Sequence, residues 1–138
     1  MFNLTASFKI RITMPYKIVV EEHHGQPMVN ACLEGDIGEE ERNRFVLDTL
    51  KVMRKHNIRK TICDIREVKL AYSLISSHNV ILSLGNMGLE INDFVAVIYR
   101  NDKDQHEHSA RVAMNRGMVN LHYFTDMEEA IQWLASKK

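Results

Sequence analysis

The chain has 138 residues, 45% hydrophobic and 26% charged, which is the profile of one ordinary globular domain. Its 18 basic and 18 acidic residues give no net charge with the histidines neutral, so no overall field favours nucleic acid, membranes or acidic partners. No apolar run approaches the roughly 20 residues of a membrane-spanning helix, and the start lacks a signal peptide's apolar core, so we expect a cytoplasmic domain without membrane insertion or nucleic-acid binding.

The first residues stand apart from the rest. Met14, Pro15 and Tyr16 read like an independent start. We expect residues 1–13 to be an N-terminal extension, either a tail or an extra strand, and residues 14–138 to form a single domain.

An opening hairpin and a long helix come next. Residues 16–22 and 28–34 are strand-like and flank a turn that contains Gly25 and Pro27. Residues 39–56 carry apolar side chains at helical spacing, with acidic residues first and basic residues last, which complements the helix dipole. We expect Asn57 to end this helix in a left-handed conformation.

The remaining chain alternates strands and helices. Strands are predicted over residues 60–65, 94–99 and 121–124, and helices over residues 73–84, 106–116 and 126–134. Asp126 and Glu129 have the spacing of a capping box. Helices between strands imply parallel pairing through right-handed crossovers. We expect an α/β fold, a mixed and mostly parallel five-stranded sheet with about four helices, in the order β-β-α-β-α-β-α-β-α.

This order, with the closing signature of residues 124–126, 129–130 and 133–134, resembles the SpoIIAA-like family. That family has the STAS-type fold of anti-sigma-factor antagonists. The resemblance covers nearly the whole chain after Met14. It implies a small cytoplasmic bacterial domain without catalytic chemistry or a cofactor, which acts through a protein partner.

In the antagonist branch of this family, a partner kinase phosphorylates a serine at the start of the second helix, usually just after an aspartate. Here Ser73 takes that place, Tyr72 replaces the acidic residue, and Ser76 and Ser77 follow within a turn. An unmodified Ser73 would cap the helix. A phosphorylated one would place about two negative charges at its positive end. A structural cap and a regulatory partner surface of Ser73, Ser76 and Ser77 both remain open.

Our leading hypothesis is a non-enzymatic regulatory or protein-interaction domain. Its surface would lie around the second helix, residues 72–84, and the following residues 85–92. A homodimer is expected if the hairpin or residues 1–13 leave a sheet edge unprotected.

A second hypothesis comes from the resemblance of this broad fold to lipid-binding CRAL-TRIO domains. The chain would then be a small-molecule or lipid carrier with an apolar pocket between sheet and helices. Met87, Phe94 and Met114 are its candidate lining, and ordinary core packing is the alternative use of these side chains.

Other reactive residues do not combine into a recognisable active site. Asp64 and Asp93 flank strands, but a phospho-acceptor pocket would need further acidic residues and a lysine. His106 and His108 are metal-compatible, yet on a helix they point about 200° apart, so no metal site is expected.

The two cysteines, Cys32 and Cys63, lie in apolar, strand-like runs. We expect buried free thiols in a reducing compartment. A disulfide and a reactive thiol are the alternatives.

Overall fold

The computed structural model describes residues 15–69, 78–100 and 120–138. Its elements are β1 (Tyr16–His23), β2 (Gln26–Asp36), α2 (Glu39–Lys55), β3 (Lys60–Lys69), α4 (His78–Met87), β4 (Phe94–Ile98), β5 (Asn120–Phe124) and α6 (Met127–Ala135). The strands form one five-stranded sheet in the order β1-β2-β3-β4-β5. β1 is antiparallel to β2, and the other neighbours are parallel. The predicted α/β fold is confirmed, and the helix predicted over residues 106–116 lies outside the described residues.

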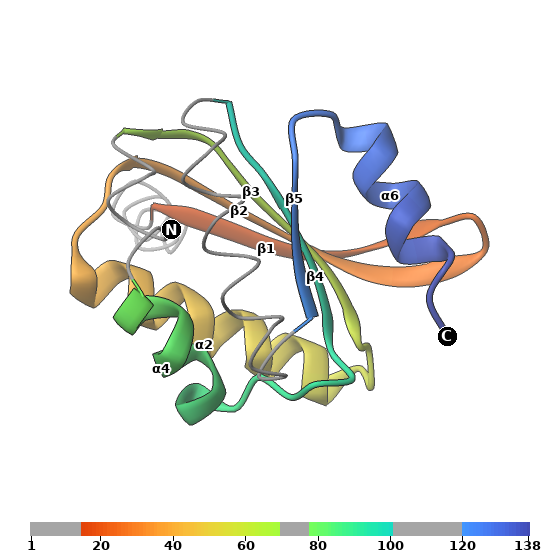
Figure 1. Ribbon diagram of the computed structural model, residues 1–138, viewed down its shortest axis with the longest axis horizontal. Coiled ribbons are helices and arrows are strands. Elements are labelled where there is room, and N and C mark those ends of the chain that lie inside the picture. Colours follow the sequence, from red (N-terminus) through yellow and green to blue (C-terminus); the bar gives the residue numbers. More distant parts are fainter. Residues whose placement is uncertain (1–14, 70–77, 101–119) are drawn as a thin grey trace, which may run out of the picture.

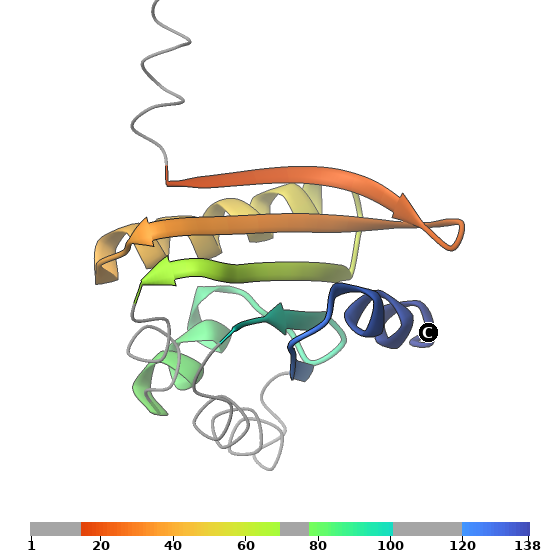
Figure 2. The same ribbon diagram turned by 90° about the horizontal axis from the view of Figure 1, so that it is seen from above.

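The sheet separates two helical layers, with α2 and α4 on one side and α6 on the other (Figures 1 and 2). On the α2 side, Phe45, Leu50 and Met53 pack against buried strand residues. The α6 side has a smaller buried cluster of Met28, Ile62, Ala96, Ile98, Ala130, Ile131 and Leu134. Within the described ranges, no helix is both long and apolar enough to cross a membrane.

α2 ends where the sequence predicts. Asn57 has a φ of 56°, the left-handed conformation that a helix stop requires. The Asn57 N–H donates to the Arg54 carbonyl at 3.2 Å, and the Ile58 N–H donates to the Met53 carbonyl at 2.8 Å. These two bonds form a Schellman motif, which satisfies carbonyl groups at the helix end and buries Ile58.

α4 ends in the same way, but later than the sequence predicts. The helix continues through Gly85 and stops before Gly88, which has a φ of 120°. The Gly88 N–H bonds to the Gly85 carbonyl and the Leu89 N–H to the Leu84 carbonyl, both at 3.1 Å. Of the two glycines that the sequence predicts to end this helix, Gly88 does so and Gly85 does not, because an interior glycine costs only about 1 kcal/mol and the extra turn buries Leu89.

β3 is also longer than predicted. It runs past Ile65 to Lys69, where the sequence predicts a connection. After a register shift, its last residues pair with β2, with Glu67 opposite Glu34. The prediction is wrong because this polar end of the strand lacks a continuous apolar run.

α6 is fixed at both ends. The Asp126 carboxylate accepts the Glu129 N–H at 3.1 Å, which confirms the predicted N-terminal cap. Beyond the last turn, the Lys60 ammonium donates to the Lys137 carbonyl at 2.7 Å. The Lys60 contact ties the C-terminal end of α6 to β3, and the helix also packs against β4 and β5.

Two leucines provide a test of the packing of α6. Leu134 is fully buried, whereas Leu47 on α2 is 44% exposed. We expect Leu134→Ala to lower the free energy of unfolding by about 2–5 kcal/mol, and Leu47→Ala by about 0.5 kcal/mol. Urea unfolding measures both, and the helix propensity change is the same at the two sites. Equal losses would contradict the α6 packing.

Candidate functional site

The surface expected to bind a partner spans residues 72–92, of which the structure describes the helix from His78 and the loop that leads to β4. We name residues 85–92 the α4–β4 surface. Gly85 and Asn86 are exposed at the helix end. In the loop, Leu89 points into the core, whereas Ile91 is 51% exposed. The loop therefore presents an apolar side chain to solvent while it is anchored from below.

The serines that the sequence singles out precede α4. Ser73, Ser76 and Ser77 lie outside the described residues, and so does Met114. In the chain they precede His78, the first residue of α4, whereas residues 85–92 begin in the last turn of this helix.

The other two predicted pocket residues, Met87 and Phe94, do not come together. Met87 packs against the core on the α2 side. Phe94 packs on the α6 side, where its ring lies edge-on to Trp133 with centroids 6.1 Å apart. The sheet separates these side chains, so one pocket cannot be lined by both.

One buried carboxylate anchors the α4–β4 surface. Asp93 is fully buried, and Arg54 donates to both of its oxygens, from Nη1 at 3.0 Å and from Nη2 at 2.6 Å. Arg59 Nη1 donates at 3.1 Å, and the Glu90 backbone N–H at 2.8 Å. A buried carboxylate without donors is strongly disfavoured, so these contacts are what permit Asp93 here. Sequence reasoning missed them because the arginines lie more than 30 residues away.

The two arginines extend this network to the surface. Arg54 also donates to the Gly88 carbonyl at 3.1 Å. Arg59 donates to the Glu90 carboxylate at 2.6 Å and to the Asn92 side chain at 3.2 Å. The bond to Glu90 is the largest of the effects that raise the pKa of Arg59, so the guanidinium stays charged. The end of α2, the start of β3 and the loop thus share one polar network.

The second candidate aspartate is separate from the first. Asp64 lies opposite Ile98, which is five residues beyond Asp93 along the chain. Arg66 donates to both Asp64 oxygens, at 3.0 Å and 2.8 Å. Burial acts to raise the pKa of Asp64, but the hydrogen bonds and charge of Arg66 outweigh it and lower the pKa. The two carboxylates therefore do not form a pair for acid–base chemistry.

The cysteines are free thiols, as predicted, but both are half-buried and not fully buried. Cys63 lies opposite Ala31 and Cys32 opposite Asp64, so the two thiols point to opposite sides of the sheet. Burial raises the pKa of Cys32 to about 11 and that of Cys63 to about 12. Both are protonated at neutral pH, which argues against a nucleophilic thiolate.

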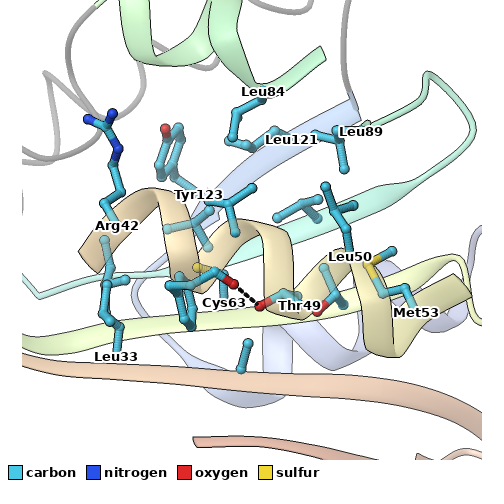
Figure 3. A pocket seen from close by; sticks show the side chains of 17 residues that line it. Leu33, Arg42, Thr49, Leu50, Met53, Cys63, Leu84, Leu89, Leu121 and Tyr123 are labelled. Atoms are coloured by element: carbon cyan, nitrogen blue, oxygen red, sulfur yellow. Dashed lines mark hydrogen bonds between the residues drawn. The ribbon is translucent and has the colours of Figure 1, made fainter. Parts of the chain in front are cut away.

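A small apolar cavity lies between α2, α4 and the sheet (Figure 3). Its volume is about 90 Å³. Neither Met87 nor Phe94 lines it. The Thr49 hydroxyl at its wall donates to the Phe45 carbonyl at 2.8 Å, so this polar group is already satisfied within α2 (Figure 3).

The histidines that the structure describes do not form a reactive site. His122 is half-buried, and its ring lies 4.5 Å from that of Trp133. Burial lowers the pKa of His122, so it is neutral at pH 7. Among the described side chains, no three His, Cys, Asp or Glu residues converge as metal ligands, and His106 and His108 lie outside them.

Comparison with known proteins identifies the fold. The sequence matches no protein-family model and no curated protein. The structure matches an uncharacterized DUF3478-family protein with a SpoIIAA-like fold from Shewanella loihica PV-4. The TM-score is 0.58 at 20% identity, over 86% of this chain and 93% of that one. This chain has a SpoIIAA-like fold.

A second match is an anti-sigma factor antagonist from Mycobacterium paratuberculosis. The TM-score is 0.54 at 12% identity, over 90% of this chain and 97% of that one. Both solved structures are thus covered almost completely. At identities this low, the two structural matches establish the SpoIIAA-like fold alone. They confirm the fold that the sequence resemblance predicted.

The role of Asp93 can be tested against a neighbouring surface carboxylate. We expect Asp93→Asn to lower the free energy of unfolding by about 2–4 kcal/mol, because two guanidinium groups lose their shared buried charge. Glu90→Gln removes an exposed partner of Arg59 and should cost less than about 1 kcal/mol. Urea denaturation of both variants measures the difference. Similar costs would argue against a buried anchor at Asp93.

The Asp64–Arg66 pair predicts a pH dependence. Because the pKa of Asp64 is lower in the folded state, its stabilisation is present above the unfolded pKa of about 3.9. This stabilisation is lost as the pH falls through the lower pKa that Asp64 has in the folded state. The stability gap between wild type and Asp64→Asn should therefore be constant from about pH 7 to pH 5 and shrink below about pH 4.

An arginine substitution provides the control for this pH dependence. In an Arg66→Met background the two side-chain bonds to Asp64 are lost, while the backbone N–H of residue 66 still donates to it at 3.1 Å and Arg100 still acts to lower its pKa. The fall of the Asp64 contribution on acidification should therefore be smaller than in wild type. Urea titrations at several pH values measure both gaps. A wild-type gap that does not change with pH would contradict the ion pair.

Proposed function

We propose that this chain is a regulatory domain that works by binding another protein and has no catalytic activity of its own. The observation that carries this proposal is the SpoIIAA-like fold together with the anchored α4–β4 surface. One of the matched structures is an anti-sigma factor antagonist, and we extend regulation through protein contact to this chain as part of the proposal.

The α4–β4 surface has properties that suit partner binding. Ile91 is exposed, with Glu90 and Asn92 on either side, and Arg59 contacts both of these polar residues. An apolar residue with a polar rim is the usual arrangement of a protein contact. Since Asp93 holds the loop from within the core, little conformational entropy is lost on binding.

Serine modification is the proposed control of this surface. Ser73, Ser76 and Ser77 precede α4 in the chain, and α4 leads directly to the α4–β4 surface. A phosphate group before α4 would add negative charge near the start of this helix, so a partner that contacts both α4 and the α4–β4 surface would bind with a different affinity.

Alternative functions receive less support from the described residues. Asp64 and Asp93 are both engaged by arginines, and both thiols are protonated, so no nucleophile–base pair is present among these groups. A carrier needs a larger cavity, because ligand pockets usually measure about 300–1,000 Å³ against about 90 Å³ here. The free thiols accord with the reducing cytoplasm in which we place the protein.

Affinity capture from the source cell tests the proposal. Wild type should retain a specific protein, and Ile91→Asp should lose it, because a charge replaces the apolar contact. Gln132→Asp adds the same charge at an exposed site on α6, on the other side of the sheet, and should retain the partner. With the partner purified, titration calorimetry should give at least about a tenfold weaker affinity for Ile91→Asp.

Two further variants separate regulation from capping. Ser73→Glu should change the affinity for that partner, whereas Ser73→Ala should not. Native mass spectrometry after gentle purification checks the carrier alternative, because a carrier should retain its ligand. Equal capture by all variants, or an unidentified small molecule in every preparation, would overturn the proposal.

A further inference from the structure

β1 has a long and regular outer edge. It is the first strand in the sheet order, and no other segment among the described residues pairs with its outer side. Its 8 residues keep an unbroken register with β2. Proteins protect an edge with a bulge, a proline, a very short strand or charged side chains. Tyr16–His23 has only the last of these, in Lys17, Glu21 and Glu22. These charges have both signs, so they disfavour a neighbouring strand only where like charges would lie opposite each other. This edge is therefore a template for another strand.

The register with β2 determines which backbone groups face outward. The Glu34 N–H donates to the Pro15 carbonyl at 2.9 Å, and the hairpin closes on the pair His23–Gln26. Hydrogen-bonded pairs recur at every second residue of an antiparallel ladder, so the odd-numbered residues of β1 bond to β2. The outward N–H and C=O groups belong to Tyr16, Ile18, Val20 and Glu22.

The sequence of β1 is self-complementary in one antiparallel register. When two copies pair about Val19, Lys17 lies opposite Glu21 of the partner subunit, and Ile18 lies opposite Val20 of the partner subunit. Directly opposed residues then lie on the same side of the sheet, as the pleat requires. By symmetry, each of these contacts forms twice.

The neighbouring registers lack this match. Pairing about Ile18 would set Lys17 against a valine, and pairing about Val20 would set Ile18 against Glu22. A register that paired odd-numbered residues with even-numbered ones would set residues of the α2 side opposite residues of the α6 side. Charge and apolar complementarity thus select the register centred on Val19.

The side chains on the two sides of β1 differ in the contacts that they make within the chain. The Glu21 carboxylate lies 2.8 Å from His23 Nε2 and accepts from the Asn30 side chain at 3.1 Å. On the other side of the sheet, Ile18 packs against the α2-side core, whereas Val20 is 42% exposed. A second copy would cover Val20 and give Glu21 a cationic neighbour.

We infer that the chain forms a symmetric homodimer in which two β1 strands pair antiparallel about Val19 and join the two sheets into one. The occupant of the edge is a second copy, because the edge complements its own sequence in charge and in apolar contacts. This inference is independent of the proposed partner surface.

Charge reversal tests the interface. Analytical ultracentrifugation of wild type should give twice the 16.0 kDa chain mass. Lys17→Glu sets two like charges opposite each other twice and should weaken the dimer at least about tenfold. Lys17→Glu combined with Glu21→Lys restores opposite charges and should recover the dimer. Circular dichroism confirms that each variant is folded.

A cross-link tests the register. Val19 and its copy would form a non-hydrogen-bonded pair with Cα atoms about 4.5 Å apart, which a disulfide can span. In a Cys32→Ser background, Val19→Cys should therefore give a disulfide-linked dimer on oxidation. Glu22→Cys places two thiols on the same edge about 20 Å apart and should not.

Three results would overturn the inference. One is a wild-type chain that stays monomeric up to about 1 mM. Another is a dimer that Lys17→Glu leaves intact. The third is a Val19→Cys variant that remains unlinked, which would place residues 1–13 or another element on this edge. None of these outcomes bears on whether a single α4–β4 surface binds its partner.

Discussion

The Asp93 carboxylate is the contact on which the architecture around the candidate surface depends. It is fully buried at the start of β4, where a lone charge would cost several kcal/mol in lost hydration. Two arginines and one backbone N–H offset that cost. Because Arg54 and Arg59 remain partly exposed, their own hydration is largely kept, and the network needs only one charge to be fully removed from water.

The same network explains why α2 and α4 end side by side. Each helix ends in a Schellman motif that buries an apolar residue, Ile58 after α2 and Leu89 after α4. Arg54, in the last turn of α2, donates to the Gly88 carbonyl just after α4. The left-handed turn at Gly88 directs this carbonyl toward Arg54. Backbone geometry and charge therefore stabilise one arrangement of the loop together.

Local features of the sequence predicted most of the fold. Asn57 and Asp126 were identifiable as a helix stop and a helix cap because each acts within a few residues of its own position. The arginine partners of Asp93 were not, since they depend on tertiary contacts across the sheet. Phe94 begins a continuously apolar strand that is buried on both sides. The periodicity of the sequence therefore could not show which side of the sheet the Phe94 side chain faces. Its separation from Met87 required the structure.

The arrangement of the sheet has a consequence for how the two proposed interfaces would act together. β1 is separated from β4 by β2 and β3, and the α4–β4 surface adjoins the start of β4. Pairing at β1 would therefore leave this surface accessible in both copies. A dimer of this kind presents two equivalent binding surfaces at a fixed separation. A partner that is itself dimeric would then gain affinity from simultaneous contact, and a change in the charge of β1 would weaken binding without any change at Ile91.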